Sequence, residues 1–169
     1  TIANQQASID HEEKRRNVGS AVAVWLLFLP ILILFGGVLG WFAPSWLKAP
    51  LEFSWSIRWA AVLLAVDLIF TSLSELPRSV LEGENLGYKR MGLSTMLVFA
   101  GGGLTALALY LKTGLTGVAT ATLVATILTG VLYLGVTRTY VPWFGIAKPS
   151  FEGVRRVLGL GGWVLGWNL

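Results

Sequence analysis

The chain has 169 residues, with 13 Lys and Arg against 9 Asp and Glu, for a formal net charge of +4. Hydrophobic residues make up 54% of it without its 20 glycines, and only 13% of residues are charged, whereas soluble domains carry about a quarter. This composition excludes an ordinary soluble domain, because 169 residues could not bury so much apolar surface. The absence of cysteine excludes disulfides, thiolate metal sites and thiol nucleophiles.

The first predicted membrane span is residues 18–41, which follow a polar, charged segment, 1–17, and contain no charge. A helix of this length extends about 36 Å, enough to cross a hydrocarbon core of about 30 Å with some tilt. Pro30 lies inside the span. We expect it to kink the helix and not to break it, because neighbouring helices can satisfy the freed carbonyl.

A loop rich in Pro and Trp, 42–58, leads to the second predicted span, 59–76. This span is short and carries two acids, Asp67 at its middle and Glu75 near its end. Tryptophans bracket the loop, which is typical of an aromatic belt at a membrane surface: Trp41, Trp46, Trp55 and Trp59.

A predicted polar turn, 77–90, precedes the third and fourth spans, 91–111 and 115–136, both without charge. Only three residues, 112–114, separate these two spans, which predicts a tight hairpin. The spans are too long and too uniformly apolar to be strands of a β-barrel, which have about ten residues of alternating polarity. The sequence therefore predicts an all-α, polytopic helix bundle.

A second polar stretch, 137–156, follows the fourth span, and 157–169 then begin another apolar helix. These last residues would extend only about 20 Å as a helix, too short to cross a bilayer. We therefore expect a fifth span that is cut short, in a chain that is a piece of a longer protein.

Lys and Arg concentrate in alternate segments. Ten lie before the first span, between the second and third, and after the fourth, against three in the other segments. The positive-inside rule places the richer segments in the cytoplasm. Short basic clusters beside apolar runs favour anionic lipid headgroups over nucleic acid as the partner. We expect these residues to be cytoplasmic anchors: Arg15, Arg16, Lys89, Arg90, Arg138, Arg155 and Arg156.

Asp67 is the most informative candidate residue, because an ionised carboxylate at mid-membrane costs at least about 2.5 kcal/mol. It is a candidate to bind a coupling Na⁺, a proton or a substrate group; the alternative is a protonated or hydrogen-bonded side chain that only holds packing. Thr71, Ser74 and Arg78 share its helical face and form a candidate substrate-binding stripe. The rival interpretation of Arg78 is local ion pairing with Glu75 and Glu82.

Small residues at Gly101–Gly103 and at Gly117, Ala121 and Ala125 predict close helix packing. The glycine run is not a phosphate loop, since no Lys-Ser/Thr follows it. His11 is a lone histidine in a chain without cysteine, which predicts neither a metal site nor a Ser-His-Asp triad. We expect no catalytic residue and no cofactor.

Residues 77–90 carry a Pro-x-x-x-Leu-x-Gly stretch followed by an aromatic and two basic residues. This segment resembles the cytoplasmic turn between helices four and five of polysaccharide and O-antigen flippases, in the superfamily that also holds multidrug extruders and the lipid II flippase. Residues 114–119 resemble the short outer turn that opens helix six of these proteins, and 151–169 resemble the linker into helix seven.

The resemblance implies that 1–147 hold helices three to six of the first lobe, and that 148–169 are a cytoplasmic linker and the start of a second lobe. It implies a bacterial inner-membrane transporter, not an enzyme, that flips polyprenyl-pyrophosphate-linked glycans by alternating access, with the remaining helices of the full-length protein as partners. The alternatives are a sibling multidrug extruder, an integral-membrane glycan-processing enzyme, and a purely structural anchor.

Overall fold

The computed structural model describes residues 10–167. In this part of the chain the fold is all-α, as the sequence predicted. The elements in chain order are α1 (His11–Trp46), the 3-10 turn η2 (Leu51–Phe53), α2 (Ser54–Gly83), α3 (Tyr88–Tyr110), α4 (Gly114–Tyr140) and α5 (Phe151–Trp167).

Within residues 10–167, four segments are long and apolar enough to cross a membrane: His11–Trp46, Leu51–Gly83, Met91–Tyr110 and Gly114–Tyr140. They contain the first, second and fourth predicted spans, and all of the third except Leu111. Their large apolar side chains remain exposed, for example Leu34 at 70% and Phe99 at 77%. Water would not tolerate so continuous an apolar surface, whereas lipid chains solvate it.

The helices extend beyond the predicted spans, so the predicted loops were too long. α1 continues to Trp46, and α2 begins at Ser54 and runs through Pro77 to Gly83. The predicted loop 42–58 is therefore mostly helical, and the predicted turn 77–90 shrinks to residues 84–87. Hydropathy predicts where a helix leaves the hydrocarbon core of a membrane, but it does not predict where the helix ends. A helix can continue in the headgroup region when its charged side chains form ion pairs with each other.

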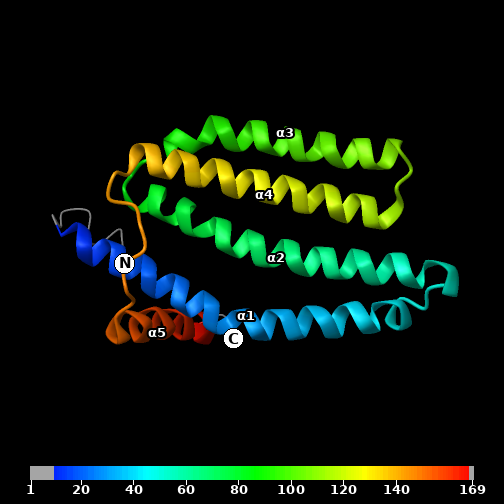
Figure 1. Ribbon diagram of the computed structural model, residues 1–169, viewed down its shortest axis with the longest axis horizontal. Coiled ribbons are helices and arrows are strands. Elements are labelled where there is room, and N and C mark those ends of the chain that lie inside the picture. The colour runs from blue at the N-terminus through cyan, green and yellow to red at the C-terminus, as the bar shows by residue number, and fades with distance from the viewer. Residues whose placement is uncertain (1–9, 168–169) are drawn as a thin grey trace.

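α1 begins with a side-chain cap: the Asp10 Oδ1 atom accepts hydrogen bonds from the backbone N–H groups of Glu12 and Glu13, at 2.9 and 3.1 Å. The two glutamates also favour a helix start, because acids stabilise the positive end of the helix dipole. The helix is unbroken at Pro30, as expected. Figure 1 shows that α1 bends along its length, and proline is a usual cause of such bends.

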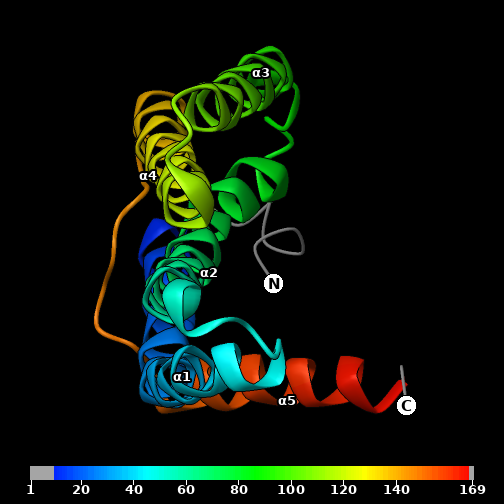
Figure 2. The ribbon, with the colours of Figure 1, turned by 90° about the vertical axis from the view of Figure 1, so that its right-hand side faces the viewer.

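The long helices form one curved layer in the order α3, α4, α2, α1, with α5 beside α1 (Figures 1 and 2). The hairpins α1–α2 and α3–α4 turn at the same end of the layer (Figure 1). The second hairpin is as tight as predicted: α3 ends at Tyr110, and Gly114 opens α4 with a φ of 69°, a conformation that favours glycine.

Small residues set the closest helix contacts. A β-carbon at Gly36 of α1 would lie 2.6 Å from the Ala65 Cβ atom of α2, and one at Gly40 would lie 3.1 Å from Val62. This Gly-x-x-x-Gly pair was missed in the sequence, although its spacing is a known packing signal. Of the predicted glycine run, Gly101 packs on α4, where its β-carbon would lie 3.4 Å from that of Ala125, whereas Gly102 and Gly103 have no such neighbour.

Thr137 joins α4 to α2. It is fully buried, and its hydroxyl donates to the carbonyls of Tyr133, at 2.8 Å, and Pro77, at 3.2 Å. We expect Thr137→Val to lower the free energy of unfolding in detergent by about 1 kcal/mol, because an interhelical hydrogen bond is lost without a change of volume. Thr139→Val is the control, since the exposed Thr139 hydroxyl bonds only within α4; equal losses would contradict the assignment.

Candidate functional site

Most of the chain's basic residues belong to the segments that meet at one end of the layer. Here α1 and α3 begin and α2 and α4 end, on the left of Figure 1; we call it the basic end. The segments counted together by the positive-inside rule thus lie together in space, as that prediction requires. Residues 141–150, which we call the strap, leave α4 at this end and cross one face of the layer to reach α5 (Figure 2).

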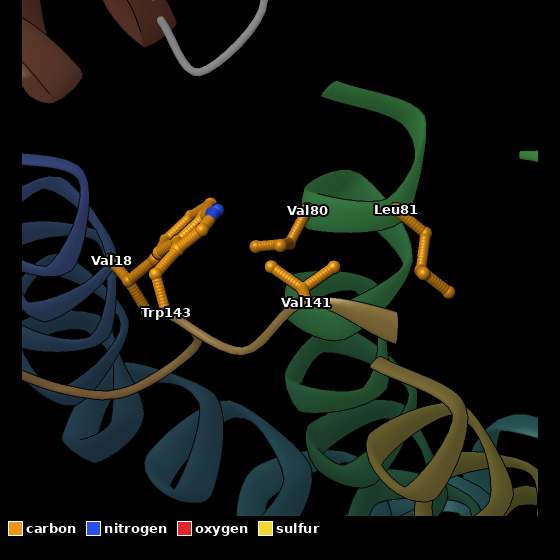
Figure 3. Packing of buried hydrophobic residues seen from close by; sticks show 5 residues of the cluster. All are labelled: Val18, Val80, Leu81, Val141 and Trp143. Carbon is orange, nitrogen blue, oxygen red and sulfur yellow. The ribbon is translucent and has the colours of Figure 1, made fainter. Parts of the chain in front are cut away.

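A small apolar core fills the basic end. Figure 3 shows its residues, which come from α1, from α2 and from the strap, and all are at most 6% exposed: Val18, Val80, Leu81, Val141 and Trp143. The predicted polar stretch 137–156 is thus wrong in its middle part, because the strap's own apolar side chains pack inside. A β-carbon at Gly19 would collide with the carbonyl of Ala147, so this glycine lets the strap lie directly on α1.

A buried ion pair borders this core. The Lys14 Nζ atom lies 2.8 Å from the Glu84 Oε1 atom, and the two side chains are only 4% and 19% exposed. The same Nζ atom lies 5.3 Å from the centre of the Trp143 ring, and Arg15 donates to the Trp143 carbonyl at 2.7 Å. The start of α1, the α2–α3 turn and the strap are therefore held together by charge.

Two other predicted anchors also contact the protein. Arg16 pairs with Glu12 at 2.7 Å on the exposed surface of α1. The Lys89 Nζ atom lies 5.2 and 4.8 Å from the ring centres of Tyr88 and Tyr140. Both side chains therefore have partners within the protein at this surface.

The remaining anchors are Arg138, Arg155 and Arg156, which are exposed, and Arg90, whose side chain lies outside the described part of the chain. Because Arg138, Arg155 and Arg156 are exposed at the basic end, their side chains are accessible to lipid headgroups. Contact with lipid itself stays a prediction.

Arg78 lies between two carboxylates of its own helix. Its Nη1 atom is 2.9 Å from Glu75 and its Nε atom 3.2 Å from Glu82, and all three side chains are 40–50% exposed. The ion pairs expected from their spacing are therefore present. The positive charge of Arg78 is neutralised locally, which makes it a poorer receptor for an anionic substrate than the sequence alone indicates.

Asp67 lies midway along α2, on the side that faces α4. Ala60 and Ser74, one heptad before and after it, mark this side: Ala60 is 1% exposed, and Ser74 lies against Gly130 of α4. The Asp67 Oδ1 atom is buried and has no hydrogen-bond partner among the described residues.

The predicted polar stripe does not form one site. Thr71 is exposed, and the Ser74 hydroxyl donates to the Phe70 carbonyl of its own helix, at 2.8 Å. Asp67 is therefore the member of the stripe with a buried polar atom that lacks a partner among the described residues.

An apolar groove of about 490 Å³ opens near the basic end. α1, α2, α4 and the strap form its walls, and Ser74 and Arg138 are its polar side chains. Sequence reasoning missed the groove, because its walls come from segments far apart in the chain. Its α2 wall starts at Phe70, about one turn from Asp67 towards the basic end.

The described residues hold no group of three or more His, Cys, Asp or Glu that could bind a metal ion. No protein-family model, curated protein or solved structure matches the chain. The described residues thus form an all-α fold with four helices that are long and apolar enough to cross a membrane, and the second of them carries at its middle an acid whose Oδ1 atom is buried.

Proposed function

We propose that the chain is part of a multi-pass transporter that flips lipid-linked oligosaccharide or polysaccharide precursors across the bacterial cytoplasmic membrane by alternating access. The observation that carries the proposal is the buried Oδ1 atom of Asp67, which has no partner among the described residues. The resemblance of residues 77–90 to the flippase turn supplies the substrate class, by analogy.

An intramembrane acid of this kind needs a partner from outside these helices. An ionised carboxylate is expensive in a membrane unless it is paired or wet. A proton, a Na⁺ ion or a polar group of the cargo could each neutralise it. Binding and release of such a partner change the charge at Asp67. The bound and the free states can therefore favour different arrangements of the surrounding helices, as alternating access requires.

The open layer also supports a transporter. Large apolar side chains are exposed along all four long helices, and these helices form a single layer (Figure 2), so one face of the layer can border lipid while the other borders a second lobe. Transporters commonly bind substrate near the bilayer midplane between two such repeats. If α2 spans the membrane as proposed, Asp67, at the middle of this helix, would lie at that depth.

A membrane enzyme fits less well. The longest non-helical stretch between described helices is the strap, which is ten residues long and partly buried in the apolar core. A glycan-processing enzyme would need a larger polar loop with clustered acids, histidines or arginines to hold its reacting groups. The proposal therefore assigns binding and movement to this chain, and no chemistry.

The test is Asp67→Asn in the full-length protein. This variant keeps the side chain's shape but cannot carry its charge, so we expect surface-polysaccharide export in a complementation assay to fall at least tenfold at an unchanged membrane level. Glu75→Gln is the control, because Glu75 belongs to the exposed ion-pair group of Arg78, and it should retain export. Export unaffected by Asp67→Asn would refute the proposal; loss of drug resistance with export intact would favour the extruder.

A further inference from the structure

We infer that the apolar groove holds one acyl chain of an anionic phospholipid from the leaflet at the basic end, with the lipid phosphate bound by Arg138. This inference does not depend on the substrate proposed above. It rests on the lining of the groove, on its length, and on the charge at one of its ends.

The lining requires an apolar occupant. Val18 and Val22 of α1, Leu73 and Leu76 of α2, and Ile146 of the strap contribute hydrocarbon walls. The hydroxyl of Ser74 already donates within its own helix. A polar ligand would lose its hydration in this groove without gaining hydrogen bonds, whereas a hydrocarbon chain loses nothing.

The length of the groove matches one leaflet. Along α4 it reaches from Ile127 to Arg138, eleven residues or about 16 Å of helix. Half of a hydrocarbon core of about 30 Å is about 15 Å. The groove therefore runs from the level of the membrane midplane to the headgroup region. Its volume of about 490 Å³ is within the range of about 300–1,000 Å³ of small-molecule sites.

The charge at the end of the groove selects the headgroup. Arg138 is exposed and forms no ion pair within the described part of the chain, in contrast to Arg78 and Arg16, which pair with carboxylates. Among the described residues, no acid lines the groove. A guanidinium binds phosphate through two parallel N–H donors, and the positive-inside rule places it at the cytoplasmic leaflet, which holds anionic lipids.

A photoreactive lipid tests the inference. The full-length protein is placed in lipid discs of phosphatidylcholine and phosphatidylglycerol, with a trace of phosphatidylglycerol that carries a diazirine at the end of one acyl chain. We expect label near Phe70 and Ile127, the deep end of the groove. Val131→Trp should reduce this label at least fivefold, because Val131 lines the groove and is 61% exposed, so that an indole can occupy the space.

Val124→Trp is the matched control. Val124 lies two turns earlier on the same face of α4, is also exposed, and does not line the groove. Labelling of the groove in this variant should therefore match that in the native chain. Equal labelling of the two variants would overturn the inference. So would an unlabelled groove in a protein that cross-links to a second copy, which would assign this face to a dimer.

The headgroup is tested separately by native mass spectrometry. We expect Arg138→Gln to weaken phosphatidylglycerol retention about fivefold, the equivalent of about 1 kcal/mol for one basic residue near anionic lipid, and to leave phosphatidylcholine retention unchanged. Arg155→Gln, an exposed arginine of α5 outside the groove, should change neither. Equal retention of the two lipids by the native chain would overturn the assignment of the phosphate.

Discussion

Replacing Lys14 with methionine is expected to lower the free energy of unfolding by about 3–5 kcal/mol, the usual cost of removing one partner from a buried ion pair. Lys14 is 4% exposed at its side chain, and its Nζ atom lies 2.8 Å from Glu84. The variant leaves the Glu84 carboxylate partly buried and uncompensated between the start of α1 and the strap. Thermal or SDS-induced unfolding of the purified protein in detergent measures the loss.

Two variants make this prediction specific. Arg16→Met removes the exposed pair with Glu12, whose side chains are 54% and 70% exposed, and should cost no more than about 0.5 kcal/mol. The double variant Lys14→Met/Glu84→Met removes both buried charges and should recover most of the lost stability, because apolar side chains can replace a buried pair without penalty. A single variant as stable as the native chain would show that the pair is not buried in the folded protein.

The four helices able to span a membrane could be predicted from the sequence, because such a helix needs about twenty consecutive, predominantly apolar residues. The stretch 115–136, for example, lies wholly inside α4. The ends of the helices could not be predicted from hydropathy, since α2 continues past Glu75 and Pro77 to Gly83. In that part of α2 the ion pairs of Arg78 with Glu75 and Glu82 stabilise the helix, so it can continue where the residues are no longer apolar.

The candidate site, like the helices, could be predicted only in part from the sequence. Asp67 was identifiable because an acid inside an apolar run is costly wherever it points, and the ion pairs of Arg78 followed from i, i+3 and i, i+4 spacing. The Lys14–Glu84 pair and the groove at Arg138 join segments far apart in the chain, up to 128 positions for Val18 and Ile146 of the groove. Spacing along one helix carries no information on such contacts.

Gly36→Leu is expected to lower the free energy of unfolding by about 2–3 kcal/mol, because it forces α1 and α2 apart. Even a single β-carbon at Gly36 would lie 2.6 Å from the Cβ atom of Ala65, whereas unstrained carbon atoms approach to about 3.5–4.0 Å. The clash is between a helix backbone position and a side chain with no rotamers, so neither can yield without moving a helix. Overpacking of this kind costs about 1–3 kcal/mol, and unfolding in detergent measures it.

Gly37→Leu provides a matched control one residue along the same helix. A β-carbon at Gly37 meets nothing within 4 Å, so the added side chain should project from the layer, and stability should change by less than about 0.5 kcal/mol. The two variants share composition, depth and the loss of one glycine, and they differ in which face of α1 is enlarged. Equal stability of the two variants would show that α1 does not pack on α2 through Gly36, and would contradict the α1–α2 contact described above.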